Sequence, residues 1–215
     1  MMPLKRAEQP AILRQNQATW TANYLSRLAK YEEKKARGQE PRKPKFTWPQ
    51  RDNKPLNQHL NPTLLAMSAN HCAYCDGFPM GAMSLRTIDH FKPKEHFAEL
   101  AYSWANLYPC CNACQDAKGS DYDQKLLRPD DGSYEFAHYF LFNYRTGDLD
   151  INPFATADKQ DRARKTLEIL GLNDRDRDLP AERARVYIDQ TERDSDTRAY
   201  RFMFTDETST GSVCL

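Results

Sequence analysis

The sequence has no apolar run of the roughly 18 residues that a membrane-spanning helix needs. Its first ten residues also lack the apolar core of a secretory signal peptide. Together these two absences predict a cytoplasmic protein, in which thiols stay reduced. A chain of 215 residues can bury a core without disulfides. Its closely spaced cysteines are therefore expected to bind metal rather than to pair with one another.

The sequence also lacks an excess of charge of either sign. It has 31 basic and 30 acidic residues, which gives a formal net charge of +1. With 28% charged residues and a mean hydropathy of −0.85, it predicts solvated helix surfaces or a large surface for a partner. A near-neutral protein is not broadly basic, so any hold on nucleic acid must come from a local patch or from a partner.

Apolar spacing predicts helices on both sides of a central cysteine-rich segment. Before this segment, Trp20, Tyr24 and Leu28 lie on one stripe of a helix from Pro10 to Arg37, with Gly38 as its cap. A second helix is expected to begin at Asn61-Pro62 and to run to about Ala69.

The region after the cysteine-rich segment is expected to form a hairpin and two helices. The hairpin strands are predicted at Tyr139–Tyr144 and Asp148–Ile151, around Arg145-Thr146-Gly147. Helical patterns cover Asp158 to Leu170, which Gly171 closes, and a charge-rich stretch from Asp176 to about Phe204. The tail from Thr208 is expected to fray, with Cys214 as an incidental thiol.

Residues 40–55 contain four prolines and are expected to form no regular element. Basic residues alternate there with two aromatic ones, Phe46 and Trp48. The basic residues are Arg42, Lys43, Lys45, Arg51 and Lys54. Such a segment either binds a phosphate backbone and stacks bases, or is a solvated loop that docks its aromatic side chains on the core.

Two pairs of cysteines, each separated by two residues, predict a metal site. They are Cys72 with Cys75, and Cys111 with Cys114. Four thiolates at these spacings suit tetrahedral Zn²⁺, and a site closed by four thiolates is structural because no position remains for water. Cys110 is an alternative to Cys111, which is preferred because it repeats the spacing of the first pair. The alternative to a metal site is a set of buried free cysteines.

The segment between the two pairs predicts two strands followed by a helix. Leu85, Thr87 and Ile88 favour a strand that Pro93 ends. A second strand is predicted at Trp104–Pro109, and a short helix at Asn112–Lys118.

In this arrangement the residues resemble the HNH endonuclease family. The resemblance rests on Ile-Asp-His-Phe-Lys-Pro-Lys, then Asn-Leu-Tyr-Pro-Cys-Cys-Asn-Ala-Cys, then Lys118-Gly119, and covers about His71 to Gly119. It is nearest to the PtuB-type HNH nucleases of Septu and retron-associated anti-phage systems, to which residues 166–173 are also similar. The resemblance implies an α+β fold, a mostly helical chain around a ββα-metal core with a four-cysteine zinc site. The expected parts are an N-terminal helix and basic loop (1–61), this core (62–131), and a hairpin with helices that packs on the core or on a partner (132–215).

The resemblance also implies the roles of three residues. His90 would be the general base, Asp89 a ligand of catalytic Mg²⁺ or Mn²⁺, and Asn106 would orient the loop that carries His90. The chemistry agrees, because phosphodiester hydrolysis needs an activated water and His titrates near neutral pH. Neighbouring residues of a strand point to opposite faces, so the strand end or the loop is expected to bend and bring Asp89 and His90 to one site.

One position departs from the family pattern. Gln115 stands where the family more often has His or Asn as second metal ligand, and Asp116 is an alternative. A Gln carbonyl can ligate Mg²⁺. Lys92, Lys94 and Lys118 are candidate phosphate contacts. His96 is expected to pack or to face phosphate rather than to bind metal.

The predicted function is therefore a metal-dependent nuclease, with DNA favoured as substrate. As the resemblance implies, it would be the effector of a bacterial defence system and work with a partner ATPase of the SMC/ABC-like, PtuA type. Two alternatives stay open: a non-catalytic zinc module that binds nucleic acid or the partner, and an effector that cleaves RNA.

Overall fold

The computed structural model describes residues 1–81, 85–189 and 197–204. The chain forms two compact units, each built from separated stretches. Unit 1 comprises Met1–Arg6, Leu65–Thr87 and Pro109–Leu215, and unit 2 comprises Ala7–Leu64 and Ile88–Tyr108. No helix of the described residues has the length and apolar character to cross a membrane.

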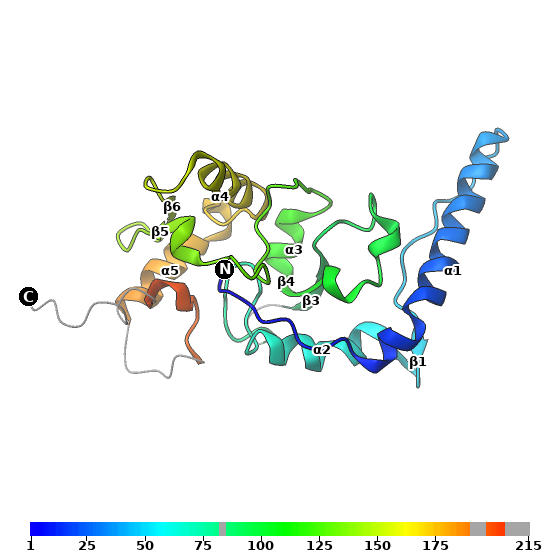
Figure 1. The fold of residues 1–215 in the computed structure, drawn as a ribbon, viewed down its shortest axis with the longest axis horizontal. Coiled ribbons are helices and arrows are strands. Elements are labelled where there is room, and N and C mark those ends of the chain that lie inside the picture. The colour runs from blue at the N-terminus through cyan, green and yellow to red at the C-terminus, as the bar shows by residue number, and fades with distance from the viewer. Residues whose placement is uncertain (82–84, 190–196, 205–215) are drawn as a thin grey trace, which may run out of the picture. The chain divides into compact units, whose positions relative to one another are not determined.

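Unit 2 begins with a long helix, α1 (Ala11–Ala36), drawn in blue in Figure 1. Its bounds confirm the predicted helix to within one residue at each end. Leu13 and Tyr24 are its buried side chains. Gly38 follows with a φ of +76°, which a glycine adopts without the steric cost of a side chain.

The loop after α1 contains a small hairpin that the prolines were predicted to exclude. β1 (Gln50–Arg51) pairs antiparallel with β2 (Lys54–Pro55). Asp52 and Asn53 form the turn with φ of 48° and 60°, a region that these residue types tolerate. Each strand has only two residues, so Pro55 removes little from the ladder.

Helix α2 (Leu56–Met67) begins five residues before the predicted start at Asn61. Pro62 therefore lies inside the helix, where it cannot donate to the carbonyl four residues back. Leu56, Leu60 and Leu64 recur every four residues and are fully buried. The prediction was wrong because the burial of this leucine face outweighs the hydrogen bond that Pro62 cannot make.

Strands β3 (Arg86–His90) and β4 (Leu107–Cys111) form a two-stranded sheet that leads into helix α3 (Asn112–Lys118). The first strand and the helix confirm the predictions. The second strand begins three residues later than predicted, because Trp104–Asn106 form a 3₁₀ turn, η2. All five residues of β4 are buried, and the last of them, Cys111, begins the second cysteine pair.

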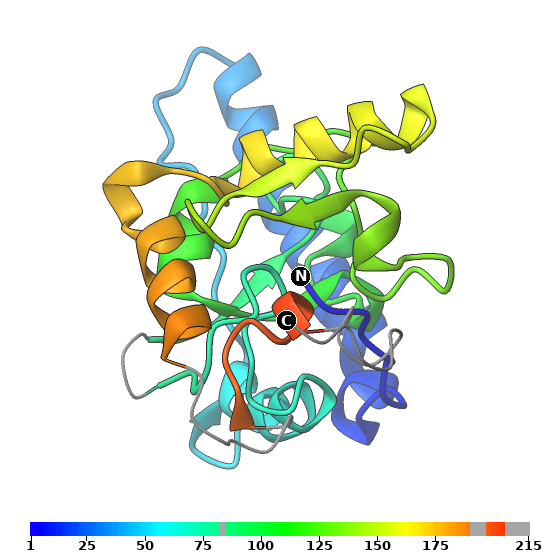
Figure 2. The same cartoon turned by 90° about the vertical axis from the view of Figure 1, so that its left-hand side faces the viewer.

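The rest of unit 1 contains the predicted hairpin, β5 (Phe140–Phe142) and β6 (Leu149–Ile151). Figure 2 shows it beside helix α4 (Ala157–Leu170), which confirms the prediction. The Thr156 side chain caps α4 by accepting from the Lys159 amide, and Gly171 ends it with left-handed backbone. In the hairpin turn Gly147 is required, since a Cβ there would lie 1.8 Å from the Pro180 carbonyl oxygen.

The last predicted helix is shorter than expected. α5 covers only Leu179–Ile188, and Arg175–Arg177 before it form a 3₁₀ turn, η4. Asp178, with a φ of +53°, separates the two, and a non-glycine residue in this region interrupts a helix. Arg201–Phe204 form another 3₁₀ turn, η6. The tail from Thr208, including Cys214, lies outside the described residues.

Candidate functional site

Four cysteines of unit 1 meet in a buried cluster. The Sγ atoms of Cys72, Cys75, Cys111 and Cys114 all lie within 4.8 Å of one another. The first pair lies in the turns after α2, and the second spans the junction of β4 and α3. The structure thus brings together the four cysteines that the spacing selected. Cys110 is left out of the cluster, and its thiol donates to the Cys111 carbonyl oxygen at 3.2 Å.

Polar groups around the cluster favour negative charge on its sulfurs. The backbone amide of Gly77 donates to Cys75 Sγ and that of Cys111 donates to Cys72 Sγ, each at 3.4 Å. Arg177 Nη2 donates to Cys114 Sγ at 3.1 Å. Burial works against the charge of this guanidinium, but the cysteine sulfurs around it outweigh burial and raise its pKa.

The thiols themselves share protons unequally. Hydrogen bonds from Cys110 and Cys114 lower the pKa of Cys111 to about 4, whereas its bond to Cys111 raises the pKa of Cys114. Four sulfurs that lie together and accept hydrogen bonds from amide and guanidinium groups are the donor set of a structural zinc site. The four cysteines could therefore hold a zinc ion.

The imidazole of His90 is held on three sides within unit 2 (His90 is 5% exposed). Its Nε2 donates to the Ala101 carbonyl oxygen at 2.8 Å, so Nδ1 is the nitrogen with the acceptor lone pair. The ring of Trp48 stacks on it, with centroids 5.6 Å apart and planes at 16°. The ring of Phe46 meets it edge-on, with centroids 5.2 Å apart. Position, orientation and tautomer of this side chain are thus all fixed by neighbours.

Asp89 is buried at 3% exposure on the same strand. β3 ends at His90, and the bend that was expected at the strand end or in the loop comes next. The chain bends directly after the strand, at Phe91 and Lys92. Both Asp89 and His90 keep strand geometry because β3 is hydrogen-bonded to β4.

Asn106 fixes the turn that follows β3. Its Oδ1 accepts from the Lys92 amide at 2.8 Å, and its Nδ2 donates to the carbonyl oxygens of Lys92 and Leu100 at 3.0 and 3.2 Å. Its own carbonyl accepts from the Phe91 amide at 2.9 Å. A single buried side chain therefore joins two loops next to His90 with three hydrogen bonds.

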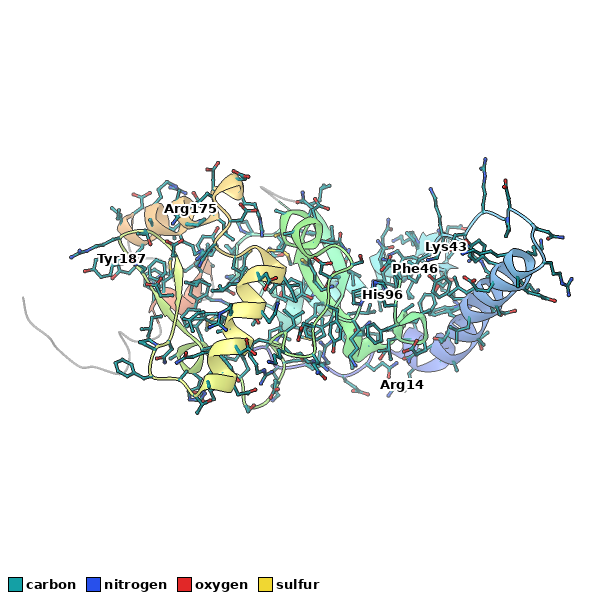
Figure 3. The ribbon with its side chains drawn as sticks, turned by 90° about the horizontal axis from the view of Figure 1, so that it is seen from above. Arg14, Lys43, Phe46, His96, Arg175 and Tyr187 are labelled. Atoms are coloured by element: carbon teal, nitrogen blue, oxygen red, sulfur yellow. The ribbon has the colours of Figure 1, made fainter. Side chains whose placement is uncertain are left out.

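The predicted basic contacts differ in exposure. Lys92 and Lys94 are half-buried, with their ammonium groups 5.4 Å from the Phe97 ring centroid and 5.6 Å from that of Phe46. His96, which is labelled in Figure 3, is exposed. Lys118, on α3 in unit 1, is buried at 1% exposure. A phosphate would have to reach its ammonium inside the fold. Gln115 is half-buried on the same helix.

Sequence reasoning missed two neighbours of these groups. The contact of Trp48 with His90 had a signal, the aromatic residues of the proline-rich loop, and the structure favours the interpretation that they dock on the core. The contact of Arg177 with Cys114 had none, because the two residues are 63 positions apart and Arg177 lies in an ordinary charge-rich stretch.

Two comparisons confirm the family resemblance. Residues 72–121 match the model of the HNH endonuclease family. The chain is 28% identical over 121 residues to the Septu protein PtuB of Bacillus thuringiensis. This similarity covers 55% of the chain and 43% of the Bacillus thuringiensis protein, so the chain matches less than half of that protein's length.

Proposed function

Because residues 72–121 match the HNH endonuclease family, we propose that the chain is a metal-dependent endonuclease that hydrolyses phosphodiester bonds, with DNA the favoured substrate. Its resemblance to Septu protein PtuB supports a role as nuclease effector in anti-phage defence. We extend this to a cytoplasmic complex with a partner ATPase of the SMC/ABC-like kind.

The proposed chemistry centres on His90. Its Nε2 is committed to the Ala101 carbonyl, so Nδ1 takes the proton from the attacking water. The fixed ring needs no reorientation before it accepts this proton, which lowers the barrier through positioning. The hydrogen bonds of Asn106 to Lys92 and Leu100 hold the loops beside it.

Asp89 would hold the catalytic Mg²⁺ or Mn²⁺. A carboxylate oxygen suits these hard cations, which usually keep several waters and take only one or two carboxylate ligands. A bound divalent cation supplies charge neutralisation at the phosphate and at the leaving oxygen. The motif alone supports the roles of three residues on α3, since this helix belongs to the other unit. They are Gln115 as second metal ligand, Asp116 as its alternative, and Lys118 as phosphate contact. Lys92 and Lys94 remain proposed phosphate contacts on unit 2.

A second candidate function is a zinc module that binds nucleic acid or a partner without cleaving it. Gln115 favours it, because a Gln amide binds transition metals less well than the imidazole of His and has a longer side chain than Asn. The burial of His90 favours it too, since a general base must reach water. Cleavage of RNA instead of DNA is compatible with the same residues.

Cleavage of plasmid DNA and of single-stranded RNA, with Mg²⁺ or Mn²⁺ and with or without the partner and ATP, tests the proposal. We expect the wild-type protein to cut and His90→Ala to reduce cutting to background. His138→Ala is the matched control, because this histidine is exposed in unit 1 beside Glu135. Wild-type activity in the His90→Ala protein would contradict the role of His90. Absence of cutting under all these conditions, with zinc bound, would favour the zinc module.

A further inference from the structure

Unit 2 contains a pocket of about 420 Å³, and of its lining residues only Lys94 already has a proposed role. Helix α1 and the proline-rich loop form its walls, together with two residues that follow β3. Its lining is Tyr24, Leu28, Lys43, Pro44, Lys45, Phe46, Lys94 and Glu95. Figure 3 labels Lys43 and Phe46, on the loop side of this pocket.

The pocket combines an aromatic and aliphatic floor with a basic rim. The rings of Tyr24 and Phe46 meet edge-on, with centroids 5.6 Å apart. Lys43 and Lys45 are exposed, and the Lys94 ammonium lies 5.6 Å from the Phe46 ring centroid. Three lysines therefore gather at one pocket of a chain whose formal net charge is only +1.

One carboxylate also lines the pocket. Glu95 Oε1 lies 3.0 Å from Lys94 Nζ. Burial opposes the charge of Glu95, but its hydrogen bond and ion pair with Lys94 dominate, so its pKa lies below the usual value. Lys94 is thus partly neutralised, whereas Lys43 and Lys45 supply the net positive charge at the rim.

The loop that carries these lysines is anchored to α1. Arg27 Nη2 donates to the Lys45 carbonyl oxygen at 3.0 Å, and the Phe46 ring packs edge-on against Tyr24 of α1. The rim is therefore positioned before a ligand arrives, which reduces the entropic cost of binding.

The pocket lies next to the proposed general base. Phe46 belongs to the pocket lining, and its ring also meets the His90 ring edge-on, with the two centroids 5.2 Å apart. A ligand on the floor would thus be one aromatic ring away from the imidazole.

We propose that this pocket holds one unpaired nucleotide of the nucleic-acid strand on which His90 acts, an inference that rests on the proposed nuclease function. The lysines at the rim neutralise its phosphate, and its base packs on the apolar floor. Basic groups around aromatic side chains are the common composition of single-strand sites. A paired base cannot enter a pocket, because it stays stacked inside the duplex and presents only its edge in the grooves.

Fluorescence anisotropy without added Mg²⁺ or Mn²⁺ measures this binding in the zinc-loaded full chain, apart from cleavage. The probes are a labelled single-stranded DNA without internal pairing and a blunt duplex of the same sequence. The Lys43→Ala/Lys45→Ala variant removes the rim, and Arg51→Ala/Lys54→Ala removes two equally exposed charges of the β1–β2 hairpin.

We expect wild type to prefer the single strand, and the rim variant to weaken its binding about tenfold or more. The slope of log affinity against log salt should fall by about 0.7 for each lost phosphate contact. The hairpin variant should change affinity by less than about threefold. Failure of wild type to bind the single strand, equal binding of the duplex, or equal losses in both variants would overturn the pocket.

A cleavage assay on the same proteins separates this inference from the proposed function. If binding depends on Lys43 and Lys45 but the wild-type protein never cuts, the proposed nuclease function is wrong and the proposed nucleotide pocket stands. If cleavage requires His90 but the rim variant binds the single strand as well as wild type, the proposed nucleotide pocket is wrong and the proposed nuclease function stands.

Discussion

The indole ring of Trp48 lies nearly parallel to the imidazole ring of His90, with planes at 16° and centroids 5.6 Å apart. The two residues come from a proline-rich loop and from the end of a strand 42 positions later. Together with the hydrogen bond from Nε2 to the Ala101 carbonyl, this contact fixes the plane of the imidazole. The loop residue thereby becomes part of the geometry on which the proposed chemistry depends.

Trp48→Ala should lower the cleavage rate about 10- to 100-fold, because a misplaced general base loses effective concentration. The loss should fall mainly on kcat. Trp48→Phe, which keeps a flat ring, should retain most of the rate. Single-turnover kinetics on a labelled substrate measures both variants, and equal rates for Trp48→Ala and wild type would remove Trp48 from the site.

Asn106→Ala should destabilise the protein by about 2–3 kcal/mol, because it removes three hydrogen bonds and leaves the Lys92 amide without its side-chain acceptor. Urea unfolding followed by tryptophan fluorescence measures the change. Asn106→Asp retains the acceptor for the Lys92 amide and loses the two donations. An alanine variant as stable as wild type would show that the two loops are held by other contacts.

Cys72→Ser should lower the zinc content of the purified protein and its melting temperature, since three thiolates leave the metal site incomplete. Cys110→Ser should keep full zinc content, because Cys110 is not one of the four clustered sulfurs and a serine hydroxyl can replace its thiol as donor to the Cys111 carbonyl oxygen. Elemental analysis and thermal unfolding read out both proteins. A protein that purifies with stoichiometric zinc despite Cys72→Ser would contradict the assigned ligand set.

Arg177→Gln should speed the transfer of zinc to a chromogenic chelator, because the guanidinium donates to Cys114 Sγ and offsets the negative charge of the thiolates. A several-fold faster transfer is the expected size. Arg175→Gln is the control, since Arg175 pairs with Asp148 instead. Identical transfer from the two variants would show that Arg177 contributes packing only.

Asp76→Asn should cost about 3 kcal/mol of unfolding free energy. The Asp76 carboxylate is 2% exposed and accepts from the side chain of Arg201 at 2.6 Å and from its backbone amide at 2.7 Å. Glu182→Gln breaks the exposed ion pair with Arg185 and should cost less than about 0.5 kcal/mol. Chemical unfolding compares them, and similar small values for both would contradict a structural role for the buried pair.

The cluster of four cysteines could be predicted because each pair is local in sequence, and spacing by two residues is a strong signal for metal. The same holds for α3, α4 and the hairpin β5–β6, in which caps and glycine turns mark the ends. In these elements, local preference and the final packing agree.

Elements whose bounds depend on long-range burial could not be predicted as well. Pro62 is a helix-start signal, yet α2 begins at Leu56 because three leucines are buried along it. The 3₁₀ turn at Trp104–Asn106 delays β4, and there the Trp104 indole donates to the Ala7 carbonyl oxygen, 97 positions away. Such partners cannot be identified from a window of neighbouring residues.

The cysteine cluster also has a topological consequence. Cys75 and Cys111 are 36 positions apart, and Asp89, His90 and Asn106 all lie on the chain between them. A metal held by both pairs would thus close a loop around the proposed reaction residues. The chain-entropy relation for cross-links gives a constraint of this length a value of about 4 kcal/mol. Loss of the metal would release this constraint from the unfolded ensemble, so the free energy of unfolding would fall although the native contacts of the residues within the loop are unchanged.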